Sequence, residues 1–159
     1  MKIPDEGRIV VSACLTGIAC THAAEAKTRD WAVRLVAEGR AIPVCPEVAG
    51  GLPIPRPAAE IQRLEGQGGA SGADVIDGEA RVIDENGVDV TENYLEGARK
   101  AARASEGLTL AVLKARSPSC GCGQTYDGTF TGTLHDADGV TAAMLKRQGL
   151  TVISDEEVG

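Results

Sequence analysis

The chain has 159 residues, of which 43% are hydrophobic and 25% charged, so we expect residues 1–159 to fold as a single domain and exclude an intrinsically disordered chain. Its net charge is −7 and only 3% of its residues are aromatic, which argues against a nucleic-acid partner, because such proteins need a basic face or stacking rings. No segment approaches the roughly 18–20 apolar residues of a membrane span, and the acidic N-terminal segment does not resemble a signal peptide, so we expect a cytoplasmic protein that does not contact membranes.

The predicted elements alternate between strands and helices. Short β-branched or apolar runs predict buried strands, and amphipathic segments that end at glycine predict helices. In chain order we expect strand Arg8–Cys14, helix Thr28–Glu38, strand Ala41–Cys45, a short peripheral strand Ala80–Ile83, helix Asp89–Ser105, strand Leu108–Lys114, helix Val140–Gln148 and strand Leu150–Ser154. This alternation predicts an α/β three-layer sandwich with a small, mostly parallel sheet of flavodoxin or Rossmann type.

Two segments rich in glycine, proline or serine are predicted as long loops that form the active site. The first spans Pro46–Gly72. We expect its proline-rich first half to form a rigid wall of the site, and its Gly66–Gly72 part to be mobile and remote. The second spans Ala115–Thr133, with a hairpin around Tyr126–Gly132.

Three of the five cysteines lie at the ends of predicted strands: Cys14 and Cys45 are the last residues of two strands, and Cys120 follows a third by a few residues. Because the carboxyl ends of parallel strands meet at one edge of a sheet, we expect these three thiols to converge. Their wide spacing differs from zinc ribbons and ferredoxin motifs, which use CxxC pairs. Soft thiolates select iron–sulfur clusters, zinc or copper(I), whereas the alternative is that these cysteines are ordinary core residues.

Polar residues near the cysteines are candidates for acid–base chemistry. Glu47, two residues after Cys45, is a candidate general base, with a loop carboxylate bonded to backbone amides as the alternative. Ser117 and Ser119 precede Cys120 and either donate to a developing anion or cap the turn.

Other residues are interpreted as supporting groups. Lys27 is a candidate source of positive charge at the site. Arg56 is a candidate substrate contact, with an ion pair to Glu60, four residues later, as the alternative. Cys20 and Cys122 are interpreted as accessory thiols that line the site or accept sulfur.

Six motifs follow one another along the chain: VSACLTG (Val11–Gly17), VCPEVAGGLPIPR (Val44–Arg56), GVDVTENYLEGA (Gly87–Ala98), LKARSPSCG (Leu113–Gly121), TYDGTF (Thr125–Phe130) and GVTAAML (Gly139–Leu145). Together they resemble a bacterial family, long a domain of unknown function, that includes the iron–sulfur-dependent 2-thiouracil desulfidases. The resemblance runs from about Ile9 to Ser154. After the first motif the family often has Cys-Arg-Tyr-Asp-Gly, where this chain has CTHAAEAK (Cys20–Lys27).

The resemblance implies a 4Fe–4S cluster held by Cys14, Cys45 and Cys120. It implies that Glu47 handles protons and activates water while Ser117 assists at the substrate. The implied reaction is a desulfuration without net redox change, in which the thiocarbonyl of a thio-nucleobase such as 2-thiouracil becomes a carbonyl and sulfide is released.

The implied partner is a small thio-base, with Lys27, Arg56 and Ser119 as candidate substrate contacts, and the protein is expected to be a monomer or a homodimer. Two alternatives stay open: a cysteine-based metal-binding protein without turnover, such as a zinc store, and a hydrolase with Cys120 as its nucleophile.

Overall fold

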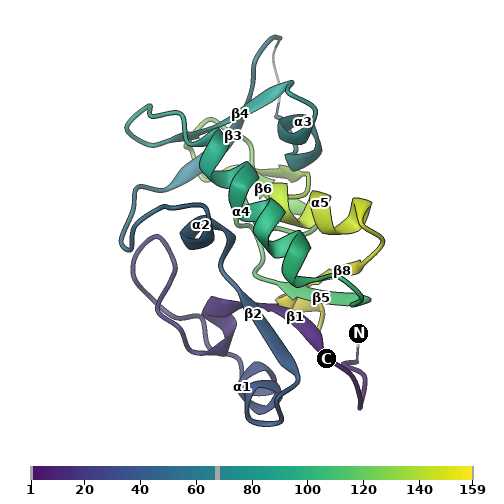
Figure 1. Cartoon of the computed structure of the whole chain (residues 1–159). Helices are drawn as coiled ribbons and strands as arrows, with labels where there is room; N and C mark the ends of the chain where they lie inside the picture. Colours follow the sequence, from purple (N-terminus) through teal and green to yellow (C-terminus); the bar gives the residue numbers. More distant parts are fainter. Residues whose placement is uncertain (1, 67–68, 159) are drawn as a thin grey trace.

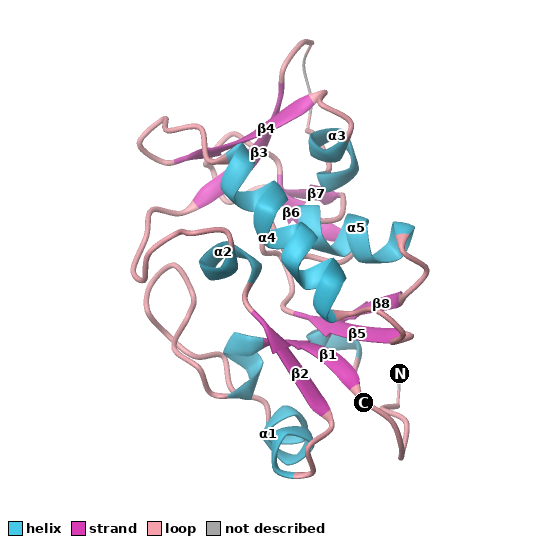
Figure 2. Ribbon diagram, viewed as in Figure 1, coloured by secondary structure: helices cyan, strands magenta, loops and turns pink. Residues whose placement is uncertain are grey.

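The computed structural model describes residues 2–66 and 69–158, and its centre is a four-stranded parallel sheet (Figures 1 and 2). The strands lie in the order β2-β1-β5-β8, with bounds β1 Ile9–Ser12, β2 Ala41–Val44, β5 Leu110–Leu113 and β8 Thr151–Ser154. Val10 of β1 pairs with Ile42 on one side and with Ala111 on the other. Ranked by chain order, these strands run 2-1-3-4, which is the flavodoxin-like arrangement. The predicted α/β class and parallel sheet are therefore confirmed.

Helices cover both faces of this sheet, as the apolar character of its strands requires. Successive side chains of a strand point to opposite faces, so Val11 packs with Leu35 of α1, and Val10 packs with Ala101 of α4 and Leu145 of α5. The three helices are α1 Asp30–Ala37, α4 Thr91–Ala104 and α5 Val140–Arg147. Figure 1 shows α1 on one side of the sheet and the α4–α5 pair on the other.

A second, antiparallel sheet packs on the far side of α4 and α5, with the helix α3 beside it. Its strands are β3 Ala59–Arg63 and β4 Ala80–Asp84, and α3 spans Gly72–Ile76. Its core contains Ile61, Val82 and Tyr94. The prediction of β4 as a strand is confirmed, and its partner is β3.

The prediction of Pro46–Gly72 as one long loop is wrong. The segment contains the one-turn helix α2 (Pro46–Ala49) and the strand β3, and its last residue begins α3. The strand β3 has only two buried apolar residues, Ala59 and Ile61. Two alternating apolar residues are too few to predict a strand in a segment rich in proline and charged residues. Within Gly66–Gly72, residues 67 and 68 lie outside the described residues, Gly69 forms a β-bridge with Gln62, and Ser71 caps α3.

The predicted hairpin in the second loop is confirmed. It consists of β6 Gln124–Tyr126 and β7 Leu134–Asp136, paired antiparallel with Thr125 opposite His135. Single turns of 3-10 helix follow two strands of the main sheet, η1 (Ala13–Thr16) after β1 and η2 (Asp155–Glu157) after β8. Within the described part of the chain, no helix has the length and apolarity needed to cross a membrane.

Candidate active site

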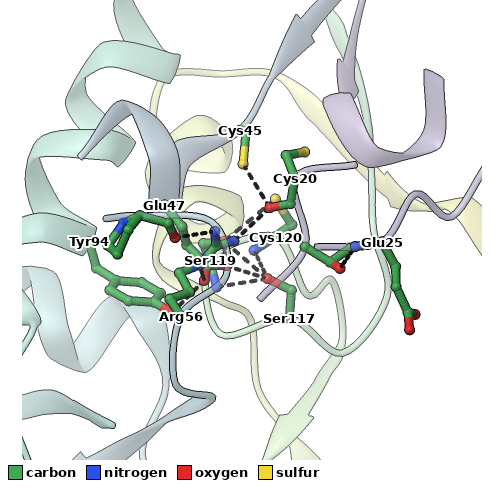
Figure 3. A network of polar contacts seen from close by, with 11 residues as sticks. Cys20, Glu25, Cys45, Glu47, Arg56, Tyr94, Ser117, Ser119 and Cys120 are labelled. Atoms are coloured by element: carbon green, nitrogen blue, oxygen red, sulfur yellow. Dashed lines mark hydrogen bonds and ion pairs between the residues drawn. The ribbon is translucent and has the colours of Figure 1, made fainter. Parts of the chain in front are cut away.

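A cleft of about 1000 Å³ opens at the carboxyl ends of β1, β2 and β5. Cys14, Cys45 and Cys120 all line it, together with Cys20 and Glu47. The strand-end reasoning thus selected three thiols that the fold brings to one cleft. Figure 3 shows Cys20, Cys45 and Cys120 in this region, close to Glu47 and to the serines of the turn after β5.

Each thiol is placed by a short turn after its strand. Cys14 lies in η1, which ends at Gly17 with a φ of 101°, a left-handed conformation that glycine adopts readily. Cys45 is the residue before α2, whose first position is Pro46, where proline is favoured. In the turn before Cys120, the Ser117 Oγ accepts hydrogen bonds from the backbone N–H groups of Ser119 and Cys120, both at 3.1 Å.

The surroundings of the thiols shift their pKa values in different directions. Burial raises the pKa of Cys14 to about 11 and that of Cys120 to about 12. The Cys45 thiol lies 3.7 Å from the carbonyl oxygen of Cys20, to which it donates. Interaction with the Cys20 thiol and with the backbone of Val48 holds the pKa of Cys45 below its usual range, despite the opposing effect of burial. Interaction with Cys45 and burial raise the pKa of Cys20. Cys20 therefore belongs to the same group of thiols.

Glu47 accepts hydrogen bonds from four side chains (Figure 3). Its Oε1 is 3.0 Å from Arg56 Nε and 2.8 Å from the Tyr94 hydroxyl, while its Oε2 is 2.9 Å from Ser119 Oγ and 3.4 Å from Ser117 Oγ. An ionised carboxylate has acceptor sites for all four. The alternative in which backbone amides hold this carboxylate is wrong, and the contacts fix Glu47 beside the turn that carries Cys120.

Arg56 holds two walls of the cleft together. Its side chain is only 4% exposed. Besides Glu47, it binds the carbonyl oxygen of Cys20 through Nη2 at 2.8 Å and that of Pro53 through Nη1 at 3.2 Å. The alternative pairing with Glu60 is wrong, since Glu60 instead accepts the backbone N–H groups of Gly128 and Phe130.

The remaining predicted residues lie at different depths. Ser119 is buried, and its Oγ is 3.7 Å from the Cys120 sulfur. Lys27 lines the cleft where it is exposed to solvent, and its Nζ is 3.1 Å from Glu25 Oε2. Cys122 lies in a separate, smaller cavity, where its thiol donates to the carbonyl oxygen of Val152 at 3.2 Å.

Sequence reasoning missed two residues of the site. Tyr94 of α4 is buried, and burial and the adjacent Glu47 raise its pKa, so its hydroxyl stays a donor. The Ser12 side chain lowers the pKa of the Cys120 thiol against the effect of burial, and its Oγ accepts the backbone N–H of Lys114 at 2.8 Å. The available signal was a hydroxyl at the end of an otherwise apolar strand.

The donor set of the cleft suits a cluster rather than a single metal ion. Within residues 2–66 and 69–158, no three His, Cys, Asp or Glu side chains are grouped so that they would hold one metal ion. A 4Fe–4S cluster makes a different demand, because each cysteine binds its own iron and thiolates are the usual ligands. Three thiols from three strand ends, facing one open cleft, fit that demand.

Comparison with known proteins identifies the family of this chain. The sequence model of the 2-thiouracil desulfurase family matches residues 9–157. A protein of Bacillus subtilis (strain 168), named uncharacterized protein YbbK, is 46% identical over 156 residues, which cover 94% of this chain and 97% of that protein. The solved structure of TudS, a 4Fe–4S-dependent thiouracil desulfidase, aligns with a TM-score of 0.79 at 38% identity and covers 96% of this chain and 93% of its own. The chain belongs to the 2-thiouracil desulfurase family.

Proposed function

We propose that this protein is a 4Fe–4S-dependent desulfidase that converts the thiocarbonyl of a thio-nucleobase such as 2-thiouracil into a carbonyl. Water supplies the oxygen, sulfide leaves, and no net oxidation or reduction occurs. Membership of the family and the likeness to TudS support this proposal. The observation that carries it is the single cleft lined by Cys14, Cys45 and Cys120 together with a carboxylate held by four donors.

In this proposal Cys14, Cys45 and Cys120 hold the cluster. When bound, such a cluster supplies an iron without a protein ligand, which polarises a carbon–sulfur bond and accepts the sulfur. Soft thiolate donors suit iron–sulfur clusters, and binding releases the protons that burial keeps on Cys14 and Cys120. The Cys20 thiol lies beside Cys45 and is assigned a supporting role.

Glu47 takes a proton from the attacking water in this scheme. Its Oε1 is held by Arg56 and Tyr94, so the carboxylate cannot turn away from the site. Its Oε2 faces the hydroxyls of Ser117 and Ser119, whose hydrogens can rotate between partners. These hydroxyls are placed to donate to negative charge that develops on the substrate, an interaction that a cleft shielded from water strengthens.

The two cationic candidates receive different roles. Arg56 directs three donor atoms at Glu47, Cys20 and Pro53, and we assign it to holding the site together rather than to contacting the substrate. Lys27 lies where solvent meets the cleft and is assigned to the substrate's entry path.

The test is anaerobic reconstitution with iron and sulfide, followed by incubation with 2-thiouracil. We expect a brown protein that releases sulfide and uracil in equal amounts. Serine variants of Cys14, Cys45 and Cys120 should lose both colour and activity, whereas the matched control Cys122→Ser should keep both. A colourless but active enzyme would support a cysteine hydrolase instead, and a brown protein inactive on every thiolated base would support a metal-binding protein.

A further inference from the structure

Phe130 is exposed inside the cleft although the chain has few aromatic residues. It is the single phenylalanine of the sequence. It lines the same cleft as the cysteines and Glu47, and 38% of its surface remains accessible. The folded chain leaves this part of a large apolar ring uncovered inside a cleft, so a ligand that covers it would gain apolar burial.

The backbone places this ring at a conformational cost. Phe130 has a φ of 57°, a left-handed conformation that is unusual for a bulky residue. Its backbone N–H donates to Glu60 Oε1 at 3.2 Å, and the same oxygen accepts the N–H of Gly128 at 2.9 Å. Glu60 is itself buried at 9% exposure. A buried carboxylate on β3 therefore fixes the loop that carries the ring.

Further contacts hold the same loop. Gly128 has a φ of 93° and lies against β3 so closely that an added Cβ would be 2.6 Å from the carbonyl oxygen of Ile61. Gln62 Nε2 donates to the Gly128 carbonyl oxygen at 2.8 Å. Within the loop itself, the Asp127 carboxylate accepts both the backbone N–H and the hydroxyl of Thr129. The ring is thus presented by a loop that is fixed on β3 and braced by its own turn, which lowers the ordering cost of binding.

We propose that Phe130 stacks on the plane of the substrate's heterocyclic ring while the thiocarbonyl points toward the cysteines. The inference rests on the proposed function and deepens it, because a flat aromatic face selects planar, unsaturated thio-heterocycles over saturated thioamides of the same size. Stacking of a base on an aromatic side chain tolerates different bases, since each has a π-face. Phe130 therefore selects the class of substrate, whereas the cysteines and Glu47 carry out the reaction.

The test compares two substrates on the reconstituted full-length enzyme. 2-Thiouracil is planar, whereas 5,6-dihydro-2-thiouracil carries the same thiocarbonyl on a puckered, saturated ring. For Phe130→Ala we expect the preference for the planar substrate, measured as the ratio of kcat/KM values, to fall by about 5- to 140-fold, the usual value of one stacked base. The loss should appear mainly in KM, and uracil should bind correspondingly more weakly in calorimetry.

Two further variants separate stacking from apolar contact and from loop stability. Phe130→Tyr keeps a ring and should keep the preference, while Phe130→Leu keeps apolar volume without a π-face and should lose most of it. Leu134→Ala is the matched control, since Leu134 is similarly exposed on the same hairpin but does not line the cleft. Its preference should equal that of the wild type.

The outcomes separate this inference from the proposed function. An active wild type whose preference is unchanged in both Phe130→Ala and Phe130→Leu overturns the stacking role alone. Equal losses on both substrates in these variants also overturn it, because they indicate a general effect on the loop. A reconstituted wild type that is inactive on every thio-compound contradicts the proposed function, and calorimetric binding of uracil to Phe130→Leu then still tests the stacking.

Discussion

The two oxygens of Glu47 have different surroundings, and this difference defines the site at the scale of single residues. Oε1 meets a guanidinium and a buried phenol, Arg56 and Tyr94, which only donate to it. Oε2 meets the hydroxyls of Ser117 and Ser119, which both donate and accept. One oxygen is therefore an anchor, and the other is free to exchange a proton.

Glu47→Gln tests that division of roles. Glutamine keeps the size of the side chain but cannot take up a proton at neutral pH, so we expect kcat to fall by about 10²–10⁴-fold, the usual contribution of a positioned acid–base group. The brown colour should remain, as measured by visible absorption of the anaerobic protein. Cys45→Ser, two residues away, should lose colour and activity together. Loss of colour in Glu47→Gln would show that Glu47 supports the ligands instead.

Tyr94→Phe tests the anchor itself. The substitution removes the hydroxyl that lies 2.8 Å from Oε1 and leaves the carboxylate with one donor fewer. Hydrogen bonds to charged groups contribute about 1.5–3 kcal/mol, so we expect the free energy of unfolding of the cluster-free protein to fall by about that amount in urea denaturation. Tyr126→Phe, on the hairpin that lines the cleft, is the control. An equal loss there would mean that tyrosine hydroxyls matter generally.

At the scale of elements, α2 and α4 meet backbone to backbone. A Cβ on Gly97 would lie 1.8 Å from the carbonyl oxygen of Pro46, and a Cβ on Gly50 would lie 1.9 Å from that of Asn93. The Asn93 side chain also donates to the Gly50 carbonyl oxygen at 2.8 Å. This close approach is the reason that Glu47, on a helix of one turn, reaches the Tyr94 hydroxyl.

Gly97→Ala separates helix propensity from packing by the sign of its effect. Alanine is the better helix former by about 1 kcal/mol, so propensity alone predicts a more stable protein. The contact with Pro46 predicts the opposite, since overpacking costs about 1–3 kcal/mol and here the obstacle is backbone. We expect a lower Tm and lower activity. Glu96→Ala is the control, because Glu96 is partly exposed on α4 and its ion pairs with Arg99 and Arg103 are surface pairs that contribute little. A raised Tm would show that α2 shifts away from the added methyl group without loss of stability.

Strands and helices could be predicted from the sequence where several apolar residues follow a regular spacing. The strands β1 and β5 are four-residue runs with every residue buried, and their predicted positions are correct. By contrast, β3 forms because β4 supplies its partner, and its own AEIQR sequence holds little local signal. The helix α2 has four residues and depends on its packing against α4.

At the scale of the whole molecule, some residues of the site could be predicted from the sequence and others could not. Cys14, Cys45 and Cys120 could be predicted to share a cleft because parallel topology alone brings strand ends together. The contact of Tyr94 with Glu47 and that of Cys20 with Cys45 could not be predicted, because the first depends on helix packing and the second on the loop that carries Cys20. Neither contact leaves a periodic pattern in the sequence.

Because the three thiols come from segments far apart in the chain, loading the cluster should also stabilise the fold. A ligand that binds only the folded state adds its binding free energy to that of unfolding. Each added 1 kcal/mol raises the Tm of a domain this size by about 2–4 °C, so we expect anaerobic reconstitution to raise the Tm by several degrees and a chelator to reverse the change.

Serine variants test whether this rise in Tm comes from a cluster bound in the cleft. Cys45→Ser should show little or no rise in Tm on reconstitution, because one of its three strand-end segments no longer binds. Cys122→Ser should gain as much as the wild type, because Cys122 lies outside the cleft. Scanning calorimetry of each protein before and after loading provides the measurement. An equal rise in Cys45→Ser and the wild type would place the iron on other thiols, and no rise in a brown wild type would show that the cluster does not tie β1, β2 and β5 together.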